Sequence, residues 1–313
     1  MIEYFILSKQ AGDSMVEIKK IAYQGWPNCI KISNDLVDLI VTTDVGPRII
    51  HFSPKDGENM MYINPAEAGS MGDDKYHTYG GHRLWHAPED FVRTYAADNF
   101  PVQVEQIKNG VRLTADTEFN GVQKIVEIQM SDDAPTVKVN HIMINHTSWT
   151  IPFALWSITV MGDGGKLIVP HADKIGHDKK LTPTHLLALW GYTKMDDPRW
   201  TWGDKYYMLR QDPAFNYAQK VGSLNTKGWA AYWRKNSLFV KKFGYDPDVV
   251  YPDFNCNFET YTDQVMLEVE SLGPNVELEP GKQAEHAEEW SLFANVKEIN
   301  SEADIEQYVL PLL

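Results

Sequence analysis

Residues 102–130 read VQVEQIKNGVRLTADTEFNGVQKIVEIQM. They contain three short runs rich in β-branched residues, and the pairs Asn109-Gly110 and Asn120-Gly121 separate these runs. An Asn-Gly pair between two such runs is a strong signal for a tight β-hairpin, because both residue types tolerate a positive φ. The stretch therefore predicts three β-strands joined by two hairpins.

The same pattern of short β-branched or aromatic runs, separated by turn residues, continues along most of the chain and is typical of an all-β protein. The further candidate strands are residues 16–23, 29–33, 36–43, 47–53, 136–145, 153–161, 229–233, 237–243, 265–272 and 284–293. Helical periodicity is confined to residues 301–308, where we expect one closing helix. Strands that do not alternate with helices disfavour a doubly wound α/β fold, and their number predicts two large sheets packed face to face.

The domain organisation is expected to be simple. The sequence shows no linker, low-complexity tract or clear internal repeat, so we expect residues 1–313 to form a single domain. Its least regular segment, residues 171–227, is rich in His, Asp, Pro, Trp and Tyr. Long irregular segments on a β scaffold tend to be binding loops.

Charge and composition limit the partners of the chain. The formal net charge is −14 at pH 7, and the few Lys-Lys pairs are isolated, which disfavours nucleic acid and anionic membranes as partners. Cys29 and Cys256 are the only cysteines, so we expect neither a disulfide framework nor a CxxC zinc site. The apolar run in residues 1–10 is too short for a secretory signal, and no run reaches the ~20 residues of a membrane helix. We therefore expect a cytoplasmic protein.

Residues 79–90, YGGHRLWHAPED, concentrate ionisable and aromatic groups behind two glycines. In a helix, His82 and His86 would share one face and could bind one metal ion. In an extended segment they would lie about 13 Å apart, at ~3.3 Å per residue, and could not chelate one ion. The adjoining glycines and proline favour the extended conformation, so we expect no metal here. In the structural alternative, Arg83 forms an ion pair, Trp85 fills the core and both histidines cap loops.

A second group of ionisable residues lies nearer the C-terminus. In the expected strand at residues 265–270, VMLEVE, a period of two places Met266, Glu268 and Glu270 on one face. This face is either a solvated acidic surface or the lining of a cleft, in which a carboxylate can act as a general base. Upstream, Glu259 lies between two aromatic residues in NFETY, and an apolar environment raises the pKa of a carboxyl group.

Aromatic residues are numerous, with 10 Trp and 15 Tyr. Several fall where core packing explains them poorly, as in DDPRWTWGDKYY at residues 196–207, which contains Trp200 and Trp202. An aromatic ring with a polar edge suits a sugar, whose C–H face stacks on the ring while its hydroxyls meet polar side chains. The composition therefore favours a carbohydrate ligand, although aromatic-rich loops also form protein interfaces.

Five stretches, taken in order, resemble the galactose mutarotase-like superfamily. They are DVGPRIIHFS (44–53), YGGHRLWHAPE (79–89), NHTSWTIPFALWSITVMGDGG (145–165), YPDFNCNFETYTDQVMLEVESLGP (251–274) and VELEPGKQAEHAEEWSLF (276–293). The resemblance covers nearly the whole chain, is strongest to a bacterial branch, and rests on the order and spacing of these motifs. It implies an all-β supersandwich of two large twisted antiparallel sheets, with a sugar cleft on the concave face.

The resemblance also implies a reaction. Aldose mutarotases open the pyranose ring with a general base that removes the C1 hydroxyl proton, while a histidine acid protonates the ring oxygen. Closure on the other face then gives the other anomer, and both groups must be tuned near neutral pH. By position, the family's glutamate base matches Glu259 best and Glu268 second, and its early sugar-binding region matches His82 and Arg83.

The sequence departs from the family in the mid-chain strand. Mutarotases commonly carry their catalytic histidine there, whereas this chain has Leu155-Trp156. An indole cannot donate a proton to a ring oxygen as an imidazolium can. Either His82, His86 or His171 supplies the acid from another strand, or the protein binds sugars without epimerising them.

Three functional hypotheses follow from the sequence. The first is an aldose 1-epimerase, with Glu259 as base and His82 or His86 as acid. The second is a carbohydrate-binding protein without turnover, and the third is a lyase or hydrolase acting on oligosaccharides. Burial of His82, Arg83 and Glu259 away from any pocket would instead indicate a structural role.

In each functional hypothesis, residues 79–90 form one wall of the cleft, and their glycines let the backbone come close. The residues expected to contact the sugar or oligosaccharide are Arg83, Trp85, Glu89, Trp156, His171, Trp200, Trp202 and Glu268. We expect no cofactor, and the sequence predicts no particular oligomeric state.

Overall fold

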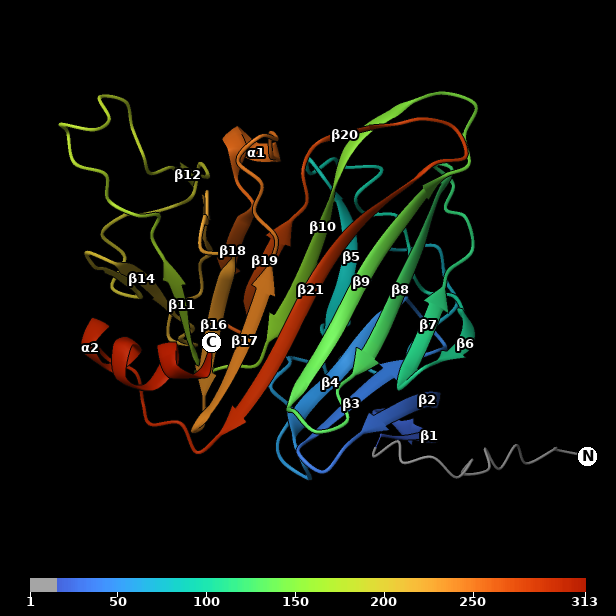
Figure 1. The fold of residues 1–313 in the computed structure, drawn as a ribbon. Helices are drawn as coiled ribbons and strands as arrows, with labels where there is room; N and C mark the ends of the chain where they lie inside the picture. The colour runs from blue at the N-terminus through green and yellow to red at the C-terminus, as the bar shows by residue number, and fades with distance from the viewer. Residues whose placement is uncertain (1–15) are drawn as a thin grey trace, which may run out of the picture.

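The computed structural model describes residues 16–313, which form two large antiparallel sheets (Figure 1). The expected all-β architecture is therefore confirmed. Residues 1–10, on which the expectation of a cytoplasmic protein partly rests, lie outside the described residues. Within residues 16–313, none of the helices is long and apolar enough to cross a membrane.

The eleven-stranded sheet begins with the N-terminal strands and continues into the strands that carry the candidate site. Its order is β1 (Glu17–Tyr23), β2 (Trp26–Ser33), β3 (Val37–Thr42), β4 (Arg48–Pro54), β5 (His82–Ala87), β10 (Ile151–Met161), β19 (Leu267–Leu272), β18 (Phe258–Thr262), β15 (Gln219–Ser223) and β12 (Leu187–Leu189), and β20 (Val276–Leu278) pairs with β10. The adjacent strands β5, β10 and β19 therefore come from the first third, the middle and the last third of the chain, respectively.

The ten-stranded sheet packs on one face of the first. Its order is β13 (Trp200–Trp202), β14 (Tyr206–Arg210), β11 (Lys166–Pro170), β16 (Trp229–Arg234), β17 (Ser237–Phe243), β21 (Gln283–Ala294), β9 (Thr136–Asn145), β8 (Val122–Met130), β7 (Gly110–Thr114) and β6 (Gln103–Ile107). The long strands β21, β9 and β8 run side by side in Figure 1.

The hydrophobic pattern of the sequence located most of these strands. The runs predicted at residues 122–130, 136–145 and 237–243 coincide with β8, β9 and β17. Both Asn-Gly hairpins are confirmed, since they join β6 to β7 and β7 to β8, and Asn109 has a φ of 55°.

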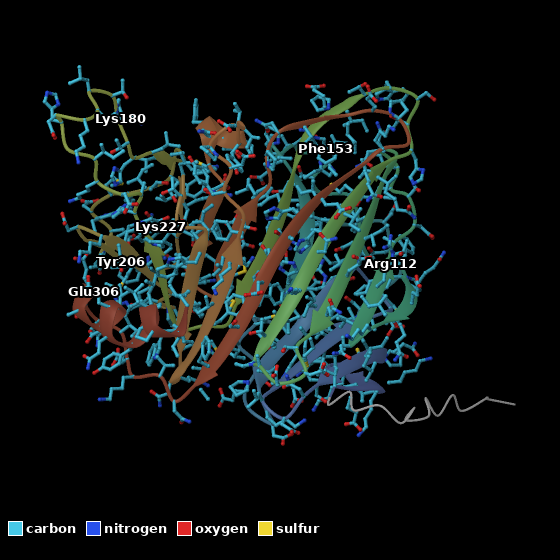
Figure 2. The ribbon with its side chains drawn as sticks, viewed as in Figure 1. Arg112, Phe153, Lys180, Tyr206, Lys227 and Glu306 are labelled. Carbon is cyan, nitrogen blue, oxygen red and sulfur yellow. The ribbon has the colours of Figure 1, made fainter. Side chains whose placement is uncertain are left out.

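The segment at residues 171–227 is more regular than its composition suggested. It contains the four strands β12 to β15, two of which have three residues and two of which have five. Strands this short show too few alternations for a period of two to stand out. The loop around Lys180, in the same segment, projects beyond the sheets (Figure 2).

The two sheets enclose an apolar core. Phe52 on β4, Phe239 on β17 and Trp290 on β21 meet within it, with ring centroids 5.6–6.2 Å apart, and all three are fully buried. Aromatic pairs at this spacing stabilise a core beyond the area that they bury. The predicted face-to-face packing of the sheets is therefore confirmed.

A short helical segment covers part of the outer surface of the ten-stranded sheet. It consists of α2 (Glu302–Asp304), the π-helical turn η1 (Ile305–Val309) and the 3-10 turn η2 (Leu310–Leu312). Ile305 and Val309 pack with buried side chains of β11, β14, β16 and β17. Figure 2 shows Glu306 of this segment beside Tyr206 at the edge of the sheet. The closing helix predicted at residues 301–308 is thus present in a distorted form.

Gly81 provides a test of the strand packing. Its φ is +70°, and a Cβ added to it would lie 2.2 Å from the carbonyl oxygen of Ile49. Gly164 has a similar φ of +72°, but a Cβ added there would meet nothing within 4 Å. We predict that Gly164→Ala lowers the free energy of unfolding by about 1–2 kcal/mol, the cost of a left-handed alanine. Gly81→Ala should lower it by at least about 2 kcal/mol more, because the backbone must also move apart.

Urea denaturation of both variants and the wild type measures this difference. Equal losses of stability in the two variants would contradict the close approach of Gly81 to Ile49. The contact also shows that the glycine lets β5 approach another strand of the same sheet, β4, rather than a ligand.

Candidate functional site

The candidate site lies on the face of the eleven-stranded sheet that is turned away from the core, which we call the outer face. Side chains alternate along a strand, so Leu84 and Leu155 face the core whereas Trp85 and Trp156 face outward. Aromatic side chains from connecting loops pack against the outward-facing residues. The outer face is therefore a second buried layer at the centre of the sheet.

Strand register brings five charged residues together on the outer face. Arg83 of β5 and Glu270 of β19 flank the same residue of β10, and Glu270 lies opposite Glu259 of β18. One step along the strands, Glu268 of β19 and Lys220 of β15 flank the same residue of β18. Glu268 and Glu270 share one face, as the period of two in the sequence predicts. We call these five residues the outer network.

A cavity of about 330 Å³ opens next to the outer network. It is lined by Pro88, Glu89, Phe91, Trp156, Trp190, Lys220, Asp253 and Glu259. Strands supply Trp156, Lys220 and Glu259, and loops supply the others. This mixture of aromatic surfaces with a few convergent charged groups is typical of a small-molecule site.

Lys220 holds the centre of the outer network. Its Nζ lies 2.8 Å from Glu259 Oε2 and 3.5 Å from Glu270 Oε2. The same ammonium lies over two indole rings, 4.5 Å from the centroid of Trp156 and 4.7 Å from that of Trp190. Although burial lowers the pKa of Lys220, Glu270 and Glu259 raise it well above its usual value. The side chain is therefore a buried cation held by ion-pair and cation–π contacts.

The carboxyl groups around Lys220 are incompletely hydrogen-bonded. Oε1 of Glu259 and Oε1 of Glu270 are buried without a hydrogen-bond partner among the described residues. Oε2 of Glu259 has the ammonium of Lys220 as its partner, at 2.8 Å. The other oxygen of Glu270 accepts a hydrogen bond of 2.8 Å from Trp156 Nε1. Buried oxygens without donors cost free energy, and the hydroxyl groups of a ligand would satisfy them.

Two carboxyl groups of the outer network have raised pKa values. Burial raises the pKa of Glu259 to about 8, and the ammonium of Lys220 opposes this rise. Burial, together with the charge of Glu270, raises the pKa of Glu268 to about 7, and Arg83 opposes that rise. Burial in this network thus favours the protonated forms of Glu259 and Glu268 more than water does.

Arg83 closes the far side of the outer network. Its guanidinium carbon lies 4.1 Å from the ring centroid of Trp85 and 5.5 Å from that of Tyr76, and its Nη2 lies 3.6 Å from Glu268 Oε1. Its Nε and Nη1 are buried without an acceptor among the described residues. The structure thus brings Arg83, Trp85 and Glu268 together, beside the cavity rather than in its lining.

His82 and His86 belong to the opposite face of β5. His82 Nε2 lies 2.7 Å from His141 Nε2, and the ring of His86 packs against Phe153. Burial lowers the pKa of His82 well below its usual value and that of His86 to about 3. Neither ring is an imidazolium at neutral pH, and neither faces Glu259. This placement contradicts the expectation that one of them supplies the acid, because both occupy core-facing positions of their strand.

The remaining residues singled out in the sequence divide into two groups. Glu89 and Trp156 line the cavity. Trp200 and Trp202 stack at 4.8 Å and pack with the core, and His171 lies against Tyr207 at the end of β11. These last residues are not brought to the cavity, because β11, β13 and β14 belong to the other sheet.

Sequence reasoning did not single out four residues of the cavity, Lys220, Trp190, Asp253 and Phe91. Lys220 lies in β15, whose five residues QKVGS show little strand pattern. Trp190 belongs to the segment at residues 171–227, whose composition did indicate a binding loop. Nothing in the local sequence marks Asp253, because its place in the wall depends on the path of the chain.

A second polar cluster, the inner network, lies between the sheets. It comprises His82, His141, His286, Glu288, Lys241, Ser157, Ser271 and Thr159. Ligand atoms of His82, His141 and Glu288 lie within 4.8 Å of one another, a spacing that could hold a metal ion. The carboxylate of Glu288 already has partners, however. It accepts hydrogen bonds from two serines and from the indole of Trp290, and Lys241 Nζ lies 2.9 Å from its Oε1. The ammonium of Lys241 therefore lies beside Glu288 where a metal ion would have to bind.

The histidines of the inner network are hydrogen-bonded to one another and to nearby protein groups. His141 Nδ1 donates to the carbonyl oxygen of His286 at 2.8 Å. Burial lowers the pKa of both His82 and His141, so each ring carries a single N–H at neutral pH. His141 Nε2 must then accept from His82 Nε2, and the hydroxyl of Thr159 donates to His82 Nδ1 at 2.9 Å. Both imidazole lone pairs are used, which favours a structural role over metal binding.

Comparison with known proteins identifies the fold. No family model matches the sequence, and no curated protein matches it. A galactose mutarotase-like protein from Lactobacillus casei matches the structure with a TM-score of 0.53 and 14% identity, over 85% of this chain and 100% of that chain. A Klebsiella pneumoniae protein with the provisional designation aldose 1-epimerase gives 0.56 and 11%, over 93% and 85% of the two chains. A Synechocystis protein gives 0.57 and 11%, over 88% and 99%.

These similarities define the class of architecture. The chain has the galactose mutarotase-like fold, with two large antiparallel sheets, as the resemblance in the sequence implied. At 11–14% identity the similarities establish the fold alone. Any function must be argued from the residues of the site.

The inner network makes a prediction about stability. Glu288→Gln removes the only carboxylate that lies within ion-pair distance of the buried Lys241 ammonium among the described residues. We expect it to lower the free energy of unfolding by about 3–5 kcal/mol, the usual cost of leaving one buried charge unpaired. Glu289→Gln, at the next and partly exposed position, should change it by less than about 0.5 kcal/mol. Chemical denaturation distinguishes the two, and comparable losses would contradict the assignment.

The outer network makes a prediction about pH. Because the pKa of Glu259 is raised, the folded protein keeps a proton that the unfolded chain releases between about pH 4.5 and pH 8. Its contribution to stability is present below about pH 4.5 and is lost as the pH rises to about 8. Glu259→Gln, which resembles the protonated form, should therefore gain stability relative to the wild type across this window, by up to about 1.4 kcal/mol per pH unit. Denaturation at several pH values measures the difference, and a difference that does not change with pH would refute it.

Proposed function

We propose that the protein binds a reducing sugar in the cavity of the outer face and acts as an aldose 1-epimerase. The observation that carries this proposal is the pair formed by Glu259 and Lys220. A carboxyl group with one oxygen free of hydrogen-bond partners among the described residues and an ammonium group lie 2.8 Å apart, and both line the cavity beside Trp156. The pair places a proton acceptor and a proton donor at one point.

Such a pair matches the geometry of anomer exchange. The C1 hydroxyl and the ring oxygen of an aldose are bonded to the same carbon, so an adjacent base and acid can reach both. In the proposed reaction Glu259 removes the hydroxyl proton as the bond between C1 and the ring oxygen breaks. Lys220 Nζ gives a proton to the ring oxygen, which leaves an open-chain aldehyde.

The second half of the reaction reverses these steps on the other face. The aldehyde turns about the bond between C1 and C2, and the hydroxyl that was the ring oxygen attacks C1. Its proton returns to Lys220, and Glu259 gives its proton to the carbonyl oxygen. Each group ends in its starting state, so no further proton donor is needed, and Lys220 takes the role that the family gives to histidine.

The rest of the site supports binding of a sugar. Trp156 and Trp190 offer apolar ring surfaces, and Glu89 and Asp253 offer acceptors for hydroxyl groups. The open oxygens of Glu259 and Glu270 would gain donors from the same ligand. Because the pKa of Glu259 is about 8 and the reaction needs its carboxylate, we expect activity to rise as the pH approaches 8.

A second candidate is carbohydrate binding without turnover. The observation that favours it is the raised pKa of Lys220, because an ammonium that holds its proton this tightly is a weak acid toward a ring oxygen. In that case Glu259 and Lys220 would orient hydroxyl groups and transfer no proton.

Exchange NMR on glucose, galactose and xylose separates the candidates. With catalytic amounts of the wild type, we expect faster interconversion of the anomers of at least one sugar, with a rate that increases between pH 6 and pH 8. Glu259→Gln and Lys220→Met should each lower the added rate at least about 100-fold, the usual contribution of one acid or base. Lys227→Met, at an exposed ion pair with Asp173, is the control and should keep the full rate.

Three other outcomes of this experiment would contradict the proposal in whole or in part. Line broadening by stoichiometric protein without added exchange would favour binding without turnover. Neither exchange nor broadening for any sugar of the panel would contradict both candidates for these sugars. Full activity of Lys220→Met would retain the epimerase and remove Lys220 as its acid.

A further inference from the structure

Three of the segments that line the cavity carry exposed aromatic side chains. Phe91 is 97% exposed, Phe254 is 89% exposed and Tyr192 is 45% exposed. Each belongs to a loop that also forms the cavity wall: Phe91 lines the cavity itself, Trp190 precedes Tyr192 by two residues, and Asp253 precedes Phe254. We call Phe91, Tyr192 and Phe254 the aromatic rim.

The backbone at Phe254 is held in an unusual conformation. The turn α1 (Pro252–Asn255) has positive φ at three successive residues, 49° at Asp253, 64° at Phe254 and 81° at Asn255. The left-handed conformation costs a residue with a side chain about 1–2 kcal/mol, and a bulky residue such as phenylalanine is a rare occupant. Asn255 supports the turn, since its Oδ1 accepts a hydrogen bond of 2.8 Å from the N–H of Tyr251. The strain positions an exposed ring that packs on little of the described chain.

Strain of this kind points to a contact outside the chain. A phenylalanine that neither fills the core nor relieves its own backbone would be replaced by glycine or asparagine without loss of packing. Figure 1 shows α1 at the same end of the sheet as β12, which Trp190 follows in the chain. Phe254 therefore follows a residue of the cavity wall, Asp253, in a turn at this end of the sheet.

The chemistry of the rim fits a sugar that extends out of the cavity. Glu89 and Asp253, two acceptors for hydroxyl groups, lie in the same loops as the rings of Phe91 and Phe254. Exposed rings next to carboxylates suit the alternating C–H and hydroxyl surfaces of a neutral saccharide. The acidic residues disfavour a phosphorylated or otherwise anionic ligand, because like charges repel.

We propose that the aromatic rim is an outer subsite that holds the second unit of an oligosaccharide, while the first unit occupies the cavity. This inference rests on the proposed function, because it extends the same site. The preferred ligand is then a neutral oligosaccharide with a free reducing end, and a free monosaccharide fills the inner part of the same site alone.

Calorimetric titration with glucose, maltose, cellobiose and lactose tests the outer subsite, because all three disaccharides present glucose at the reducing end. We expect the wild type to bind at least one disaccharide roughly tenfold more tightly than glucose, as contact with the rim adds stacking surface. Phe254→Ala should remove this preference and leave the affinity for glucose unchanged. Phe254→Tyr keeps the ring and should keep the preference, and Phe119→Ala, at a 71% exposed ring outside the rim, is the matched control.

Phe254→Gly separates loss of the ring from loss of the fold. Glycine relieves the left-handed strain, so we expect a higher midpoint of thermal unfolding together with loss of the disaccharide preference. A variant that is more stable and binds disaccharides less well cannot be explained by misfolding.

Three outcomes would overturn the outer subsite. Equal affinity for glucose and every disaccharide would remove it and leave the proposed function intact. A preference that survives in both Phe254→Ala and Phe254→Gly would place the second unit elsewhere. A change in oligomeric state by light scattering in Phe254→Ala, without an effect on sugar binding, would assign the rim to a protein contact. Failure of glucose and all disaccharides to bind would instead count against the proposed function itself.

Discussion

The alternation of side chains across the strands is the constraint on which the rest of this structure depends. In β5 and β19 it directs one set of polar residues toward the core and the next set to the outer face. The two networks that result are built alike, each around a buried lysine: Lys241 with Glu288 inside, and Lys220 with Glu259 outside. They differ in how many of their polar atoms have hydrogen-bond partners within the protein. This difference distinguishes the inner network, a structural cluster, from the outer network, a candidate site.

The inner network satisfies its members from within the protein. Glu288 accepts three hydrogen bonds besides its contact with Lys241, and its pKa is lowered despite burial. The outer network leaves oxygens of Glu259 and Glu270 and two nitrogens of Arg83 unpartnered among the described residues. Ordered water or the hydroxyl groups of a ligand can supply the missing partners of such buried polar groups.

The sequence predicted the fold more fully than the site. Strands such as β8 and β9 are long enough to show their period, and two Asn-Gly pairs fixed the hairpins beside them. The same period placed Glu268 and Glu270 on one face. The sequence could not show which face of β5 would carry the site, so it predicts an acid at His82 or His86 as well as sugar contacts at Arg83 and Trp85, on opposite faces of the strand. The sequence did not indicate Lys220, because its role depends on strands that pair only in the folded chain.

A crystal structure of the complex with a reducing disaccharide tests the central claim most directly. We predict that the reducing unit lies in the outer-face cavity, with its C1 hydroxyl within hydrogen-bond distance of Glu259 and its ring oxygen near Lys220 Nζ. The sugar should leave the inner network unchanged, with the ammonium of Lys241 still beside Glu288. A sugar bound at another surface, or one that reaches the cavity without approaching Glu259, would contradict the claim that this carboxyl group and Lys220 form the working pair.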